Sequence, residues 1–580
     1  MSPPTKLLST DILAGLAAVD ALLQPFNRSD APGLVVGIAH DGRVVHRRAV
    51  GMASLEHGVA LAPSTRVRIA STSKHFTALA VLLLAEDDKL DVDDLIYQHL
   101  PELPVLSSAG PTLRQLMRHT GGCREDLSTI AHGLALEPAE DWTKPAHSLQ
   151  SELNFEPGNR MIYSNGGYQW LARVVERVSG QRFDRFLQER IFAPLGLLDT
   201  ESVASDFDIR PGKAAQYQAL PAAAGGGYRR GMYPGELRGS GSLVSSVDDL
   251  LRWLAHLRSP VKTVGSAASW AQMLEPAVLS TGTVVPYGLG LMHHAYRGVE
   301  VIHHAGAVLG ATSQMITVPG HALDIVILAN GASVSTVALG FQIIDALLGD
   351  VHLGPPIEHA SAMALPAVVG QRYHAAATGA VLQFENVGGK LALSWMGSRA
   401  TPLRQDGDSV WLACEDVALN PISISLAALG GAGKGEGAPG MLMVSDGGNL
   451  LHCERLHDEP PATDTLAAAL AGAYRVPDLA ADAWVERDAS GLSLRLQGPH
   501  GRNTYCLQIL SADVLLAIPV DPLLGTLVGN AIVNVDRAAG RVVGLRMDLP
   551  RIRHLRFLRR SSENESESTV DLFMESCGNA

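Results

Sequence analysis

Residues 71–85 read Ser71-Thr72-Ser73-Lys74-His75 and then a nearly unbroken apolar run from Phe76 to Ala85. The run predicts a helix, which starts directly after a serine and a lysine that are three residues apart. Residues at i and i+3 share one helix face, so the Lys74 amine is expected to reach the Ser71 hydroxyl. The helix N-terminus also stabilises negative charge that develops beside it. The stretch therefore predicts a nucleophilic serine.

The same short pattern occurs a second time, as Ser259-Pro260-Val261-Lys262. About two chance matches are expected in a chain of this length. Pro260 and the loop expected around it argue against a helix-borne site there. The neighbouring motifs must therefore separate the two matches.

Length and composition set the broad class. A chain of 580 residues is too long for one core, which predicts several units or one large domain with appendages. The hydrophobic content of 46% with 18% charged residues indicates a well-packed globular protein. The net charge of -13 disfavours nucleic acid and anionic membranes as partners, because both repel an acidic surface. The remaining class of function is chemistry on small molecules or peptides.

The cysteines and the N-terminal segment predict a soluble cytoplasmic protein. Five dispersed cysteines without a C-x-x-C spacing suit a reducing compartment. The apolar stretch Ile12 to Val19 lies between Asp11 and Asp20, which indicates an amphipathic helix and not a signal peptide. No run approaches the ~18 apolar residues of a membrane span.

Two hairpins are expected near the ends of the first 350 residues. The apolar runs Leu34 to Ala39 and Val44 to His46 flank Asp41-Gly42, which favours a type I′ turn. Gln314 to Val318 and Leu323 to Ala329 form a second pair. Because helical patterns lie between them, we expect an antiparallel sheet whose first and last strands meet, with helices packed on it.

The helical patterns have clear ends. One has apolar residues spaced as on a helix face and closes at Gly180, a suitable C′ residue. Another opens after Ser245-Ser246 and continues with Asp248 and Asp249, as a capped helix does. A further helical segment spans Ala338 to Leu348.

Two proline-bearing breaks divide the remaining chain, at Gly349 to Pro366 and at His457 to Thr465. The segments after the breaks resemble each other weakly, and each has short strands and Gly-rich turns over about 100 residues, as in a small β-barrel. We therefore expect a catalytic-sized domain at 1–350, lipocalin-like barrels at 362–458 and 464–560, and a disordered tail at 561–580. Gly430 to Gly437 is also expected to be mobile.

Two further motifs follow Ser71 in order. Tyr163-Ser164-Asn165 precedes an amphipathic helix, and a phenolic oxygen of lowered pKa there would take the Ser71 proton and pass it to a leaving amine. Lys74 would hold that tyrosine as phenolate. His304-Ala305-Gly306 follows the strand-like run Val299 to Ile302. H-x-G recurs elsewhere in the chain, so the order of the motifs is the evidence.

These motifs resemble those of the serine β-lactamase and penicillin-binding-protein superfamily, most closely its class C-like branch, over roughly Ala31 to Gly349. The resemblance implies an α+β fold in which an antiparallel sheet carries helices. It also implies an acyl-enzyme on Ser71, backbone N–H groups of Ser71 and Ala307 as oxyanion donors, and no metal or other cofactor. Supporting segments are Leu116 to Gly122, Gly239 to Ser246, and Tyr287 to Gly290. The candidate site residues are Ser71, Lys74, Tyr163 and His304 as catalytic groups and Asn165, Gly306, Ala307 and Asp521 as substrate-binding groups.

The third motif, at His304, narrows the expected class of substrate. Lactamases and carboxypeptidases usually have Lys where His304 stands, and a neutral imidazole binds a carboxylate poorly. Two trailing barrels resemble the D-stereospecific aminopeptidases, in which a loop of the last barrel enters the active site. Pro519 to Asn530 is our candidate loop, with Asp521 recognising a substrate ammonium. Met292 stands where those enzymes tend to have Asn, which favours a bulkier or more apolar peptide.

The predicted function is a serine hydrolase acting through an acyl-enzyme, as a D-stereospecific aminopeptidase or small-peptide amidase. The alternatives are an esterase, a β-lactamase or DD-carboxypeptidase-like enzyme, a peptidase of linearised cyclic peptides, and a non-catalytic binding protein on the same scaffold. The expected partners are a small peptide, amide or ester substrate and, as an open alternative, a second copy of the chain. The segment from Arg551 to Arg560 alternates Arg with apolar residues, which we interpret as the solvated face of a final strand.

Overall fold

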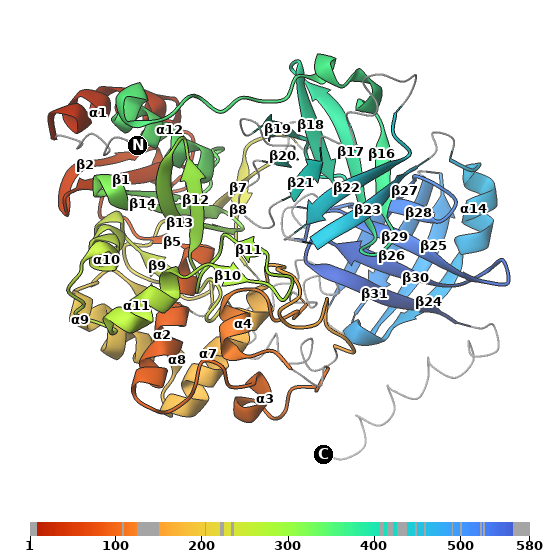
Figure 1. The fold of residues 1–580 in the computed structure, drawn as a ribbon, viewed down its shortest axis with the longest axis horizontal. Helices are drawn as coiled ribbons and strands as arrows, with labels where there is room; N and C mark the ends of the chain where they lie inside the picture. The colour runs from red at the N-terminus through yellow and green to blue at the C-terminus, as the bar shows by residue number, and fades with distance from the viewer. Residues whose placement is uncertain are drawn as a thin grey trace.

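The computed structural model describes residues 9–560 apart from 107–109, 125–149, 204, 221–224, 234–236, 406–410, 415–421, 426–437, 447–448, 457–459, 490, 499–500, 522–524 and 526–527. An α+β unit at the left of Figure 1 is followed by two β-barrels at the right. The segment 430–437 and the tail 561–580 lie outside the described residues, and the domain limits stay a prediction.

A six-stranded antiparallel sheet with the order β12-β13-β14-β15-β1-β2 organises the α+β unit. Its strands are β1 (Leu34–His40), β2 (Arg43–Val50), β12 (Met292–Tyr296), β13 (Val299–Val308), β14 (Ala311–Val318) and β15 (Leu323–Ala329). Strands β1 and β15 pair with Leu34 opposite Ala329, so the first and last hairpins meet as predicted. Asp41 and Gly42 have φ of 51° and 74°, the left-handed values that a type I′ turn requires.

Helices cover both faces of this sheet. Helices α1 (Ser9–Leu23) and α12 (Thr336–His352) pack on one face, in a core that includes Val36. On the other face the core includes Val35 and is shared with α2 (Lys74–Glu86), α7 (Asn165–Ser179) and α10 (Val247–Arg258). Adjacent residues of β1 thus enter different cores, because successive side chains of a strand point to opposite faces.

The predicted helix ends are confirmed. Helix α7 closes at Gly180, with φ of 70°, and the Ser246 hydroxyl caps α10 by accepting from the Asp249 amide. In the described part of the unit, the other helices are α3 (Ile96–His99), α4 (Leu113–Met117), α8 (Phe183–Leu187), α9 (Ala193–Leu195) and α11 (Ala267–Leu274). Its short strands are β3 (Met52–Ser54), β4 (Val59–Ala60), β5 (Val67–Arg68), β6 (Glu201–Ser202), β7 (Tyr217–Ala219), β8 (Tyr228–Arg230), β9 (Leu243–Ser245), β10 (Ala277–Val278) and β11 (Val284–Val285).

Both trailing segments form closed eight-stranded barrels. The first consists of β16 (Arg372–Ala375), β17 (Ala380–Val387), β18 (Lys390–Trp395), β19 (Thr401–Gln405), β20 (Trp411–Cys414), β21 (Ile422–Ser425), β22 (Met441–Asp446) and β23 (Asn449–Arg455). After α14 (Thr463–Leu470), the second consists of β24 (Gly472–Val476), β25 (Ala481–Asp488), β26 (Gly491–Gln497), β27 (Arg502–Ile509), β28 (Val514–Pro519), β29 (Ala531–Ala538), β30 (Arg541–Leu549) and β31 (Ile552–Arg559). The weak similarity between the two segments is confirmed, because they share one architecture. Tyr373 of β16 and Tyr474 of β24, each in the first strand of its barrel, are both buried.

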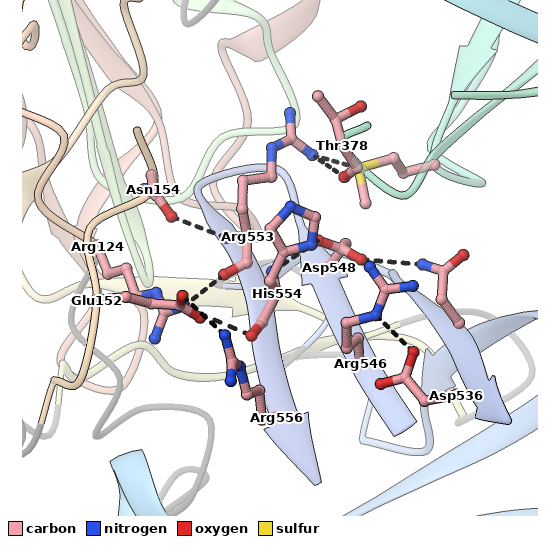
Figure 2. A network of polar contacts seen from close by, with 12 residues as sticks. Arg124, Glu152, Asn154, Thr378, Asp536, Arg546, Asp548, Arg553, His554 and Arg556 are labelled. Carbon is pink, nitrogen blue, oxygen red and sulfur yellow. Dashed lines mark hydrogen bonds and ion pairs between the residues drawn. The ribbon is translucent and has the colours of Figure 1, made fainter. Parts of the chain in front are cut away.

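The β30–β31 hairpin of the second barrel is held by all three units (Figure 2). Buried Arg124 bonds Asp478 and the Arg553 carbonyl oxygen, the latter at 2.9 Å. Arg553 as a whole is only 2% exposed, and its guanidinium lies 3.1 Å from Asp446 of the first barrel. The interpretation of Arg551 to Arg560 as a solvated face is therefore wrong for Arg553, because its side of the strand is covered by neighbouring units.

Among the described residues, no helix combines the length and the apolar character needed to cross a bilayer.

Candidate active site

Ser71 lies on a 3₁₀ turn (Ala70–Ser73) that leads directly into α2. Ala70 has φ of 49°, a left-handed value that is costly for a residue with a Cβ and that turns the chain sharply before the serine. Strand β13 passes close to this turn: a Cβ at Gly306 would lie 2.1 Å from the Ile69 carbonyl oxygen and 3.0 Å from the Ser71 nitrogen. Glycine at 306 is thus required by the approach of the strand.

Lys74 is completely buried and directs its amine at three oxygen atoms. The Nζ atom donates to Ser71 Oγ at 3.1 Å, to Asn165 Oδ1 at 2.6 Å and to the Ser240 carbonyl oxygen at 2.8 Å. Three acceptors match the three N–H groups of an ammonium, so this geometry favours the charged lysine. The i, i+3 contact between Ser71 and Lys74 is present as predicted.

The segment from Gly239 to Ser246 supports the start of α2. The Gly239 carbonyl oxygen accepts from the Thr77 hydroxyl at 2.7 Å, and the Ser240 carbonyl oxygen accepts from Lys74. The Leu243 amide donates to Ser73 Oγ at 3.1 Å. Sequence reasoning named this segment but did not assign the Ser240 carbonyl oxygen a contact with Lys74.

Tyr163 packs beside Lys74 just before α7 begins at Asn165. The side chain is 2% exposed, and Lys74 Nζ lies 4.7 Å from its ring centroid. The Arg551 guanidinium lies at the same distance from that centroid. Arg551 belongs to the turn between β30 and β31, so the second barrel contributes a cation to this site. The solvated-face interpretation is therefore wrong for Arg551 as well.

His304 is buried in a directed chain of hydrogen bonds. The Ser164 amide donates to His119 Nδ1 at 3.1 Å, so His119 Nε2 carries the proton and donates to Tyr287 Oη at 3.1 Å. The Tyr287 hydroxyl then donates to His304 Nε2 at 2.9 Å, and His304 Nδ1 donates to the Ala305 carbonyl oxygen at 2.6 Å. Both ring nitrogens of His304 thus bond within the protein.

This environment keeps the His304 ring neutral. Burial, together with the charge of Lys74, lowers the pKa of His304 from its ordinary 6.5 to about 3. Burial and Lys74 also lower the pKa of His119 well below its usual range, and burial raises the pKa of Tyr287. His304 therefore offers no positive charge to a substrate near neutral pH.

The edge of β13 borders the serine turn. Strand β12 pairs with β13 only as far as His303, opposite Met292, among the described residues. The Thr72 hydroxyl lies 2.8 Å from Ser313 Oγ of β14, and Ser313 donates to the Ile69 carbonyl oxygen at 2.7 Å. Ala307 follows Gly306 on β13, where it is exposed and pairs with Thr312 of β14.

Asp521 lies 3.7 Å from Arg229 of β8 and is about half exposed. Gly231, just after β8, approaches Gly310 of the β13–β14 turn so closely that a Cβ would lie 2.6 Å from its Cα. The beginning of the Pro519 to Asn530 loop is thus placed toward the sheet end that carries Gly306 and Ala307. Positions 522–524 and 526–527 lie outside the described residues.

The structure brings together Ser71, Lys74, Tyr163 and Asn165, with His304 behind them. Sequence reasoning missed Tyr287 and His119, although both stood in segments that it quoted as supporting ones. It also missed Arg551, for which no local signal exists. The second S-x-x-K match is structural, because Lys262 donates to the His256 and Leu257 carbonyl oxygens at the end of α10.

Comparison with known proteins identifies relatives of the whole chain. Residues 19–347 match the family Beta-lactamase. The chain is 26% identical to a D-aminopeptidase of Gluconobacter oxydans over 543 residues, which cover 92% of this chain and 96% of the relative. It is 28% identical to a D-aminopeptidase of Brucella anthropi over 432 residues, or 70% and 77% of the two chains.

A solved structure shows the same fold. The octameric penicillin-binding protein homologue from Pyrococcus abyssi superposes with a TM-score of 0.53, at 19% identity, over 76% of this chain and all of the homologue. Together, these findings define a serine hydrolase of the β-lactamase-like superfamily. The chain belongs to the Beta-lactamase family.

Proposed function

We propose that this chain is an aminopeptidase that removes an N-terminal D-residue from small peptides or amides through an acyl-enzyme on Ser71. The observation that carries the proposal is the contact of Lys74 with both Ser71 and Asn165, in a chain that aligns over 92% of its length with a D-aminopeptidase. That alignment includes the barrels as well as the α+β unit.

The chemistry is a two-step acyl transfer. The Ser71 oxygen attacks the carbonyl carbon of the N-terminal residue, and its proton passes to the Tyr163 phenolate. The C–N bond then breaks while Tyr163 returns the proton to the leaving amine. Water attacks the resulting ester and gives a proton to Tyr163, which returns it to Ser71 as the acid leaves.

The other residues hold this geometry. Lys74, whose N–H groups point at three protein oxygens, acts as a fixed cation and leaves the base role to Tyr163. Backbone N–H groups of Ser71 and Ala307 are the proposed oxyanion donors, each worth about 10²–10³ in rate. His304 orients Tyr287, and Asp521 is the proposed partner of the substrate ammonium. A homodimer stays a prediction.

A substrate panel with a serine-reactive probe tests this function. D- and L-aminoacyl p-nitroanilides, short-chain esters and a chromogenic cephalosporin are compared with wild type and with Ser71→Ala. We expect turnover of D-aminoacyl anilides and probe labelling, both abolished by Ser71→Ala. Turnover of the cephalosporin alone overturns the aminopeptidase, and absence of labelling overturns the enzyme assignment of Ser71.

A further inference from the structure

A pocket of about 330 Å³ lies on the outer surface of the second barrel, where the β30–β31 hairpin faces Glu152 of the α+β unit. This volume falls in the range of small-molecule sites. The residues that line the pocket all belong to the described part of the chain, and they include none of those placed around Ser71. The pocket is therefore separate from the candidate active site.

Two arginines stand side by side in the wall of this pocket. Arg546 of β30 and Arg556 of β31 are directly opposite each other in the antiparallel register. Their chain neighbours point into the barrel core, so both arginines lie on the outer face of the sheet. Like charges at directly opposed positions repel each other. An anion bound between the two guanidiniums relieves that repulsion.

Both guanidiniums keep N–H groups for a ligand. Arg546 Nε donates to Asp536 Oδ1 at 2.8 Å, and Arg556 Nη2 donates to Glu152 Oε2 at 3.2 Å. Neither guanidinium makes another hydrogen bond to the described residues. Because a guanidinium carries five N–H groups, both Nη atoms of Arg546 and the Nε and Nη1 atoms of Arg556 are left as donors.

An acid flanks each of the two arginines (Figure 2). Glu152 is fixed in place, because its Oε1 atom accepts from buried Arg124 at 2.7 Å. On the other side, Asp536 of β29 accepts through Oδ1 alone among the described residues, so Oδ2 is open to a further donor. The pocket thus combines cations that suit a carboxylate with an oxygen that suits an ammonium.

One end of the pocket is apolar. The side chains of Val543 and Leu558 line this end, and the two residues are 48% and 51% exposed. Gly544 pairs directly with Leu558 and lies two residues before Arg546, on the same face of β30. Since glycine has no side chain, this position leaves space on the outer face. That space suits a small apolar group.

We propose that this pocket binds a free α-amino acid as its zwitterion. The carboxylate lies between the Arg546 and Arg556 guanidiniums, whose planar donors bind carboxylates in a bidentate manner. The ammonium is bound by Asp536, and an apolar side chain packs against Val543 and Leu558. This inference goes beyond the proposed function, because the site uses no residue of the proposed catalytic machinery.

Calorimetric titration tests the site without any turnover. Racemic leucine, so that either enantiomer can bind, is compared with leucinol, which lacks the carboxylate, and with 4-methylpentanoate, which lacks the ammonium. Arg495→Gln is the matched control for Arg546→Gln, because both arginine side chains are 35% exposed and Arg495 pairs with Glu486 in the same barrel. We expect wild type and Arg495→Gln to bind leucine about 10-fold more tightly than either analogue. Arg546→Gln should raise the Kd for leucine by about 10-fold or more.

Two further variants separate the contacts. Arg556→Gln should weaken leucine binding as Arg546→Gln does, and it changes a more exposed side chain, so it serves if the latter fails to fold. Asp536→Asn should bring the Kd values for leucine and 4-methylpentanoate to within about twofold of each other, because the ammonium loses its partner.

Three results overturn the proposal. They are equal affinity of wild type for leucine and 4-methylpentanoate, leucine binding that survives both arginine variants, and absence of leucine binding at about 10 mM. If wild type turns over no aminoacyl anilide but binds leucine with the expected dependence on Arg546 and Arg556, the proposed function fails and the pocket assignment stands.

Discussion

The Arg551 guanidinium of the second barrel lies 4.7 Å from the ring centroid of Tyr163, which is buried in the α+β unit beside Lys74. The barrel therefore takes part in the site directly. This relationship depends on Asn154, which fixes the backbone on both sides of Ile552.

Replacing Asn154 with Ala should loosen the β30–β31 hairpin. Three hydrogen bonds are lost, two of them to the hairpin, which costs about 1–3 kcal/mol of unfolding free energy. The value of kcat/KM for a D-aminoacyl anilide should fall several-fold as Arg551 becomes less ordered beside Tyr163. Urea denaturation and steady-state kinetics measure the two effects. Asn386→Ala, which removes the acceptor of the Gly389 amide in a first-barrel turn, should leave kcat/KM unchanged. Equal kinetics for both variants would show that the hairpin is not coupled to the site.

The two S-x-x-K matches should behave in opposite ways. Lys74→Met removes a buried cation that contacts Ser71 and Asn165, and we expect kcat to fall by about 10²–10⁴. Lys262→Met removes two bonds to the end of α10, so it should lower stability by about 1 kcal/mol and keep kcat within twofold. Steady-state kinetics on a D-aminoacyl anilide measure kcat for both variants. A comparable kcat for the two variants contradicts the assignment.

Tyr287→Phe should destabilise the protein because it leaves His119 Nε2 and His304 Nε2 without their shared partner. Leaving buried polar groups unsatisfied costs about 1–3 kcal/mol each, measured as the change in unfolding free energy in urea. The matched control is Tyr505→Phe, since the buried Tyr505 hydroxyl has no hydrogen-bond partner among the described residues. That variant should be neutral or slightly stabilising. A smaller effect for Tyr287→Phe than for the control refutes the directed chain.

Stability should fall steeply between about pH 6.5 and pH 4. In the folded protein the pKa of His304 is about 3 and that of His294 about 4, both lowered chiefly by burial, whereas unfolded histidines titrate near 6.5. Below pH 6.5 the unfolded state binds protons that the native state excludes, so each such histidine removes about 1.4 kcal/mol of unfolding free energy per pH unit. Urea denaturation from pH 7 to pH 4.5 measures the slope. His304→Gln should reduce this slope by about one proton, and a wild-type slope below one proton contradicts the prediction.

Asp521→Ala should raise KM for substrates with a free amine, because the proposal pairs this carboxylate with the substrate ammonium. We expect an increase of about 10-fold for a D-aminoacyl anilide and none for its N-acetylated counterpart, provided that the latter is turned over or inhibits. Asp513→Ala is the control, since Asp513 pairs with Arg537 in the same barrel. An unchanged KM for the free amine refutes the pairing of Asp521 with the substrate ammonium.

Features set by neighbouring residues were predictable from the sequence. The contact of Ser71 with Lys74, the type I′ turn at Asp41-Gly42 and the end of α7 at Gly180 all follow from helix periodicity and from φ preferences, which act within a few residues. The antiparallel sheet and the two barrels followed from the order of such elements, and the domain limits stay a prediction.

Contacts between distant segments were decided only by the tertiary structure. The order of motifs predicted that His304 lies near Ser71, but its hydrogen bonds to Tyr287 and Ala305, and hence its neutral state, depend on strand register and burial. The two S-x-x-K stretches differ in what packs around their lysines, which no four-residue pattern encodes. Arg551 was interpreted as solvated because alternation predicts which face a residue occupies and not what covers that face. The docking of three units, held by Arg124, Asn154 and Arg553, placed this cation at Tyr163.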